Sequence, residues 1–145
     1  MAKSSDSFSA EERQAMKDRA KEFREARKKA AQDPLGDMME KISQMDPHDR
    51  KMALRIHEIV SDAAPELQPK TWYGMPAWAT AGKDGKVICF YQSAEKFKVR
   101  YSTFGFQETA NLDSGTFWPT SYALTELTPE VEAQIAQLVK TAVSS

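Results

Sequence analysis

The sequence has few of the residues that catalytic and metal sites require. Its 145 residues include one cysteine, and its two histidines have no close Cys or His partners. A single cysteine excludes an intrachain disulfide, as is typical of reducing compartments, and the histidines do not match the spacing of a structural zinc site. The chain also has no glycine-rich phosphate loop, HExxH motif or nucleophile elbow. These absences weigh against an enzyme, so we predict no catalytic residues and no cofactor.

Excess charge and long apolar runs are also missing. The 20 Lys and Arg residues nearly balance the 21 Asp and Glu residues, which gives a net charge of −1. This charge is too small to attract nucleic acid or an anionic membrane. No apolar run approaches the roughly 20 residues of a membrane-spanning helix, and the residues after Met1 lack the apolar segment of a signal peptide. We therefore predict a cytoplasmic protein that binds neither nucleic acid nor membrane.

Residues 1–34 form a polar segment that contains one predicted helix. Ser9 and Glu12 have the spacing of a capping box, and Phe8 is placed as a hydrophobic staple, so we expect a helix over residues 10–32. The apolar stripe of this helix is too narrow to pack deeply into a core. Three interpretations of such a stripe are open. The helix is either partly solvated or pairs with a partner helix, as in a homodimer. A third interpretation, a basic nucleic-acid arm, is disfavoured by the acidic residues interleaved with the basic ones.

Residues 35–145 combine helical and strand patterns in the order typical of an α+β domain. Apolar residues recur at helical spacing in the first and last parts of this region, and short apolar or alternating runs lie between them. The pattern predicts an antiparallel sheet of about five strands with helices packed on one side, preceded by the N-terminal helical extension. The expected helices cover residues 38–45, 47–63 and 128–142, and the expected strands cover residues 77–80, 87–91, 96–101 and 117–124.

Two of these strands carry more specific expectations. Residues 87–91 are apolar without alternation, which indicates a central strand covered on both faces, and Cys89 within it is predicted to be a buried, inert thiol. Residues 96–101 alternate strictly, with three cations on the outward side. Residues 103–115 are expected to form a turn and a short helical segment. The residues predicted to point inward from the alternating strand are Phe97, Val99 and Tyr101.

The aromatic stretch at residues 72–78 is the strongest candidate for a binding site. Residues 72–122 hold 12 of the 14 aromatic side chains, which is more than a minimal core needs. The stretch predicts a rigid aromatic wall for a ligand, with nearby cations orienting an anionic group. Core packing of the tryptophans and a solvated cationic face are the simpler interpretations. The predicted ligand-binding residues are Trp72, Tyr73, Met75, Trp78, Lys96, Lys98 and Arg100.

Several segments resemble the YdhG-like family. They are Ala64-Pro65-Glu66-Leu67, Lys70-Thr71-Trp72-Tyr73-Gly74-Met75-Pro76-Ala77-Trp78, Lys96-Phe97-Lys98-Val99 and Ala110-Asn111-Leu112, within a match over about residues 37–142. The Trp-Tyr-Gly-Met-Pro run is the most specific of them. The resemblance implies a small α+β fold of the secretion-chaperone-like type, in a mostly bacterial, cytosolic family known as a domain of unknown function. One branch of that family is described as a frataxin-like iron chaperone.

Three classes of function are consistent with these patterns. The first is a non-enzymatic binding module for a small anionic or aromatic ligand or for a protein partner. The second, implied by the resemblance, is an iron chaperone that delivers iron through surface carboxylates, the hard oxygen ligands that iron accepts. The third is an enzyme of unknown reaction. The candidate iron ligands are Glu58, Asp62 and Glu66.

Overall fold

A computed structural model describes residues 9–145, without the side chains of residues 26, 27 and 29–32. Phe8, the predicted staple residue, lies outside the described residues. The chain divides into two compact units, Met1–Pro34 and Leu35–Ser145. None of the helices found within the described residues is long and apolar enough to cross a membrane.

Among the described residues of the first unit, helix α1 (Ala10–Gln32) confirms the predicted helix. Its start is the capping box expected from the sequence. The backbone amide of Ser9 donates to Glu12 Oε1 at 3.0 Å, and the backbone amide of Glu12 donates to Ser9 Oγ at 3.0 Å. These two bonds satisfy amides that the first turn of a helix otherwise leaves unpaired. The hydrogen bond from the Ser9 amide also lowers the pKa of Glu12.

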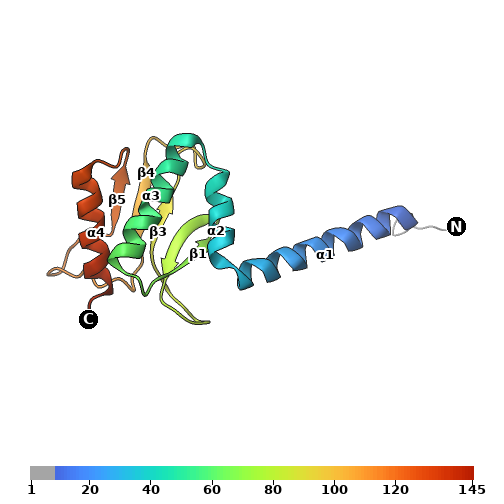
Figure 1. Ribbon diagram of the computed structural model, residues 1–145, viewed down its shortest axis with the longest axis horizontal. Helices are drawn as coiled ribbons and strands as arrows, with labels where there is room; N and C mark the ends of the chain where they lie inside the picture. The colour runs from blue at the N-terminus through green and yellow to red at the C-terminus, as the bar shows by residue number, and fades with distance from the viewer. Residues whose placement is uncertain (1–8) are drawn as a thin grey trace. The chain divides into compact units, whose positions relative to one another are not determined.

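The second unit contains a five-stranded antiparallel sheet whose strands lie in chain order. Helices α3 and α4 cover one face of this sheet (Figure 1). This arrangement confirms the predicted α+β fold, with about five antiparallel strands and the helices on one side. The elements are α2 (Pro34–Ser43), α3 (Pro47–Ala63), β1 (Gln68–Trp72), β2 (Met75–Ala79), β3 (Val87–Gln92), β4 (Ser102–Phe106), β5 (Ser121–Leu124) and α4 (Pro129–Val143).

The two faces of the sheet bury different side chains. A large cluster joins the sheet to the helices, and a smaller cluster of Ala77, Ala79 and Val87 is packed by Trp72 and Phe90. Strand β3 contributes to both clusters, which confirms that it is central and covered on both sides. Cys89 in this strand is fully buried, as predicted, and burial raises the pKa of its thiol. The helix-side cluster includes Ile56, Val60, Trp78, Tyr91, Phe104 and Val139.

The predicted strand over residues 96–101 is wrong. Turns form here instead. The Val99 amide donates to the Ala94 carbonyl at 3.0 Å, and Lys98 has a left-handed backbone with φ of 55°. Strand β4 takes the position beside β3 that the alternating segment was expected to fill. The three cations therefore do not share one strand face. The predicted inward residues Phe97, Val99 and Tyr101 are 41%, 49% and 37% exposed.

Other boundaries also differ from the sequence prediction. The short helical segment expected within residues 103–115 is wrong, because the chain there completes β4 and then turns. Strand β1 was not predicted, so the strand expected first, at residues 77–80, corresponds to the second strand of the sheet. The β1 sequence is mainly polar and contains Pro69, which has no amide to donate and is tolerated because β1 is an edge strand.

Gly105 in β4 allows the ring of Phe90 to lie against the strand. A Cβ atom at this position would lie 2.5 Å from Phe90 Cζ. We expect Gly105→Ala to lower the free energy of unfolding by about 1–3 kcal/mol, because the ring must leave its packing position. Urea denaturation measures the loss. Adding Phe90→Leu should make the glycine replacement less costly, because the smaller side chain frees the space. An equal cost in both backgrounds would contradict this explanation.

Candidate functional site

The aromatic stretch forms a tight hairpin between β1 and β2. Trp72 pairs with Met75 across the turn, and Tyr73 and Gly74 have φ angles of 51° and 76°. Two consecutive left-handed residues are the mark of a type I′ turn, which suits the twist of a hairpin. Tyr73 at the tip is 82% exposed. The Trp72 ring contacts the rings of Tyr73 and Phe90, with centroids 4.9 Å and 5.3 Å apart.

Trp78 points away from this aromatic group, into the core between the sheet and the helices. Its side chain is 1% exposed, and its Nε1 donates to His57 Nδ1 at 3.1 Å. Burial lowers the pKa of His57, which favours the neutral ring that this hydrogen bond requires. Met75 is also buried. These two predicted ligand-binding residues therefore belong to the folded interior, and the structure separates Trp78 from Trp72.

The three predicted cations make different contacts. Lys96 Nζ donates to the Gly74 carbonyl at 2.8 Å, which joins the β3–β4 connection to the hairpin tip. Lys98 forms an ion pair with Glu95 at 3.2 Å. Arg100 lies over the ring of Tyr101, with the guanidinium carbon 5.1 Å from the ring centroid. Among these three cations, Lys96 contacts the hairpin through its hydrogen bond to Gly74.

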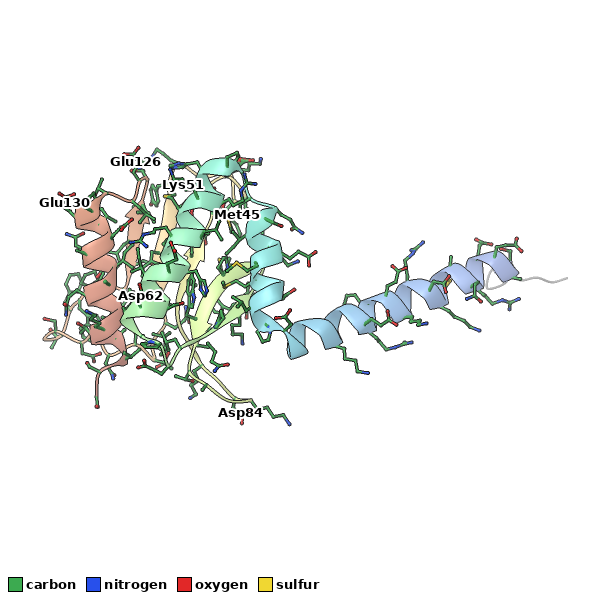
Figure 2. All side chains as sticks on the ribbon, viewed as in Figure 1. Met45, Lys51, Asp62, Asp84, Glu126 and Glu130 are labelled. Carbon is green, nitrogen blue, oxygen red and sulfur yellow. The ribbon has the colours of Figure 1, made fainter. Side chains whose placement is uncertain are left out.

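A pocket of about 210 Å³ lies beside the contact between Lys96 and Gly74. We call it the hairpin pocket. It is formed where the end of α2 and the start of α3 meet the hairpin tip and the β3–β4 connection, and Figure 2 labels Met45 at the α2–α3 junction. The pocket is lined by Lys41, Gln44, Met45, Asp46, Gly74, Ser93, Glu95 and Lys96.

Charged groups of both signs line the hairpin pocket, and they are not equally compensated. Within residues 9–145, neither Lys41 nor Lys96 forms an ion pair, whereas Glu95 is paired with Lys98. Asp46, the N-cap residue of α3, makes no capping hydrogen bond with its side chain. Burial and the neighbouring Asp49 carboxyl raise the pKa of Asp46. The pocket therefore presents two ammonium groups without an ion-pair partner among the described residues, beside Asp46 and beside Glu95, whose charge is offset by Lys98.

Asp49 supports the hairpin pocket from inside the protein. It is 3% exposed, and its Oδ2 accepts hydrogen bonds from Ser93 Oγ and, at 3.0 Å, from the Glu95 amide. Burial alone would raise the pKa of Asp49, but the hydrogen bonds from Ser93 and Glu95 outweigh it, so the pKa lies below its usual value. The Asp49 carboxylate thus fixes the start of the β3–β4 connection against α3.

A second buried polar group fixes the other end of this connection. Ser102 Oγ accepts a hydrogen bond from the Ala94 amide at 3.1 Å and lies 3.1 Å from the Tyr91 hydroxyl. Sequence analysis did not identify Asp49, Ser93 or Ser102. The sequence signals were two carboxylates one helical turn apart, Asp46 and Asp49, and serines at the ends of strands. Residues of these types are far more often solvent-exposed capping or turn residues.

The candidate iron ligands do not form a recognisable centre. The described part of the chain contains no group of three or more His, Cys, Asp or Glu side chains placed to hold a metal ion. Glu58 is instead paired with Arg55 at 3.3 Å. Asp62, labelled on α3 in Figure 2, lines a separate surface pocket, and Glu66 is exposed after the helix ends. Iron delivery through these carboxylates stays a prediction.

Comparison with known proteins does not assign the chain to a family. No protein-family model, no curated protein and no solved structure matches it. Membership of the YdhG-like family thus stays a prediction that rests on the segments quoted above. The function has to be argued from the site itself.

Asp49 and Asp46 should differ sharply in their effect on stability. We expect Asp49→Ala to lower the free energy of unfolding at pH 7 by about 2–4 kcal/mol, because two inward-facing donors lose their acceptor. Asp46→Asn is the matched control. It removes a charge beside Asp49 without the loss of a capping hydrogen bond, since the Asp46 side chain makes none, so stability should stay equal or rise. Urea denaturation measures both variants, and similar losses would argue against the role given to Asp49.

The contribution of Asp49 should also depend on pH in a defined direction. Its folded-state pKa is lowered, so its stabilising effect is complete above the unfolded-state pKa of about 3.9 and is lost as the pH falls through the folded-state value. The difference in unfolding free energy between the wild type and Asp49→Ala should therefore shrink below about pH 4. Urea denaturation at pH 7, 4 and 3 tests this. A difference that stays constant would contradict the lowered pKa.

Proposed function

We propose that this chain is a non-enzymatic, cytoplasmic binding module that holds a small anionic ligand in the hairpin pocket. The main support is that Lys41 and Lys96, both without an ion-pair partner among the described residues, line a pocket of about 210 Å³. A carboxylate or phosphate of low molecular mass matches this size. An ammonium group binds such an anion as a compact charge with three hydrogen-bond donors.

The contacts of Lys96 prepare it for this role. One of its three donors is used by the Gly74 carbonyl at 2.8 Å, which holds the ammonium group at the pocket while two donors remain for a ligand. Holding the side chain in the unliganded protein reduces the conformational entropy lost on binding. Lys41 comes from the last turn of α2 and brings a second positive charge to the same space.

The acids of the pocket oppose an anion less than their number suggests. Glu95 is partly neutralised by Lys98 at 3.2 Å. Burial and the neighbouring Asp49 carboxyl raise the pKa of Asp46. The pocket also adjoins the start of α3, where the partial positive charge of a helix N-terminus favours an anion.

The hairpin contributes to the pocket in a different way from the one predicted. Its lining residue is Gly74, whereas Trp72 packs with Phe90 on the face of the sheet opposite α3 and α4. An aromatic part of a ligand would contact Tyr73, which stands exposed at the tip next to Gly74. The Trp72 ring lies 4.9 Å from the Tyr73 ring and would report such a contact by fluorescence.

Lysine substitutions test the proposed anion site. Succinate and inorganic phosphate are titrated against the labelled protein and followed through amide chemical shifts. We expect Lys41→Gln and Lys96→Gln each to weaken binding about 5–10-fold, because each removes one charge–charge contact worth roughly 1 kcal/mol. Lys51→Gln is the control, since this α3 residue does not line the pocket and is labelled in Figure 2. Equal weakening by all three, or no saturable binding of either anion, would contradict the proposal.

We also propose that α1 joins two copies of the chain. Met16 and Phe23 on this helix are 49% and 63% exposed, and their spacing of seven residues places them on one face. Apolar residues repeated on one helical face are suited to pairing with a second helix. We expect the double variant Met16→Lys, Phe23→Lys to sediment with half the mass of the full-length wild type. Identical masses for the two proteins would rule out this contact.

A further inference from the structure

A second cavity lies between β5 and α4 and shares no lining residue with the hairpin pocket. We call it the β5–α4 groove. Its volume is about 510 Å³, which falls within the range of sites for small organic molecules. The groove lies at the edge of the sheet, because β5 is the last strand in the strand order and α4 supplies further lining residues.

The walls of the β5–α4 groove are mainly apolar. Phe104, Leu124 and Ile135 form its buried part and are each at most 5% exposed. Val131 and Leu138 of α4 are partly buried and continue the apolar surface toward solvent. Burying a ligand against such a surface removes apolar area of both partners from water. This contributes a favourable free energy of about 25 cal/mol per Å². These walls favour a ligand with an apolar chain or ring as its body.

The charged lining of the groove itself is of one sign, and Glu126 also lines an adjoining pocket with His48, Lys51 and Arg55. Glu126 is the one charged residue in its lining, and no Lys, Arg or His lines it. Glu126 forms no ion pair with any described residue. The turn that carries it is fixed by His48, whose Nε2 donates to the Thr125 carbonyl at 2.8 Å. Figure 2 shows Glu126 near the end of α4 that carries Glu130, a residue of the first turn of this helix.

We propose that the β5–α4 groove binds a small amphipathic amine. The apolar body lies against Leu124, Ile135 and Leu138, and the protonated amine faces the carboxylate of Glu126. The sign of the charge separates this ligand class from fatty acids and other apolar carboxylates, whose head group would be repelled by Glu126.

A matched pair of probes tests the proposal in the full-length protein. 4-Phenylbutylamine and 4-phenylbutyrate have the same apolar body and opposite charges. We expect the amine to shift amide resonances of residues 122–138 in a saturable way, and the carboxylate to bind at least about 5-fold more weakly. Equal affinity for the two probes, or no saturable shift with the amine at millimolar concentration, overturns the proposal.

Two single-residue variants separate the local contact from general electrostatics. Glu126→Gln should weaken amine binding about 5-fold and reduce the preference over the carboxylate. Glu130→Gln removes the same charge at the same end of α4 but outside the groove lining, and it should change affinity less than about 2-fold. Equal effects of the two variants overturn the assignment to Glu126.

A third variant tests where the apolar body lies. Gln134 is exposed on α4 and lines the groove, so Gln134→Trp adds bulk to the wall without changing the buried core. It should abolish the saturable shifts while leaving the melting temperature close to that of the wild type. Binding that persists in a folded Gln134→Trp protein overturns the location in the groove.

Discussion

The buried carboxylate of Asp49 is the contact on which the shape of the candidate site depends. It joins the first turn of α3 to Ser93 and to the Glu95 amide, which belong to the connection between β3 and β4. This connection then carries Lys96 to the hairpin carbonyl of Gly74. A carboxylate held inside the protein must be matched by donors, because an unpaired buried charge is costly. The same hydrogen bonds therefore satisfy Asp49 and position Lys96.

Elements with strong local signals could be predicted from the sequence. Helix α1 has its capping box, α3 begins with Asp-Pro, and α4 begins with Thr128, whose side chain accepts a hydrogen bond from the Val131 amide. These signals act within a few residues, so the sequence contains all of the necessary information. Residues 96–101 show the opposite case. Their alternation fits a strand, but their own backbone forms turn hydrogen bonds. Strand β4 takes the pairing position beside β3 instead.

The candidate site could be predicted only in part, for a related reason. Tyr73 and Lys96 stood out because aromatic and cationic residues cluster in the sequence, and the hairpin brings them near one pocket. Lys41 and Asp46 come from the α2–α3 junction, about 30 to 55 residues earlier, so their presence depends on tertiary packing. The prediction that Trp78 binds the ligand rests on its closeness to Trp72 in the sequence. Strand alternation places residues 72 and 78 on opposite faces once the two-residue turn intervenes.

The order of the strands has a consequence for how this domain assembles. Every strand pairs with its neighbour in the chain, so the sheet has low contact order and closes only short loops as it forms. The contact between α3 and α4 closes a longer stretch of chain than any strand pairing does, and it therefore costs more loop-closure entropy. Removing α4 breaks no strand pairing, because its neighbour β5 is held by β4. Helix α4 nevertheless buries Ile135, Val139 and Ala142 in the main core, so the core of the domain is complete only once this late contact has formed.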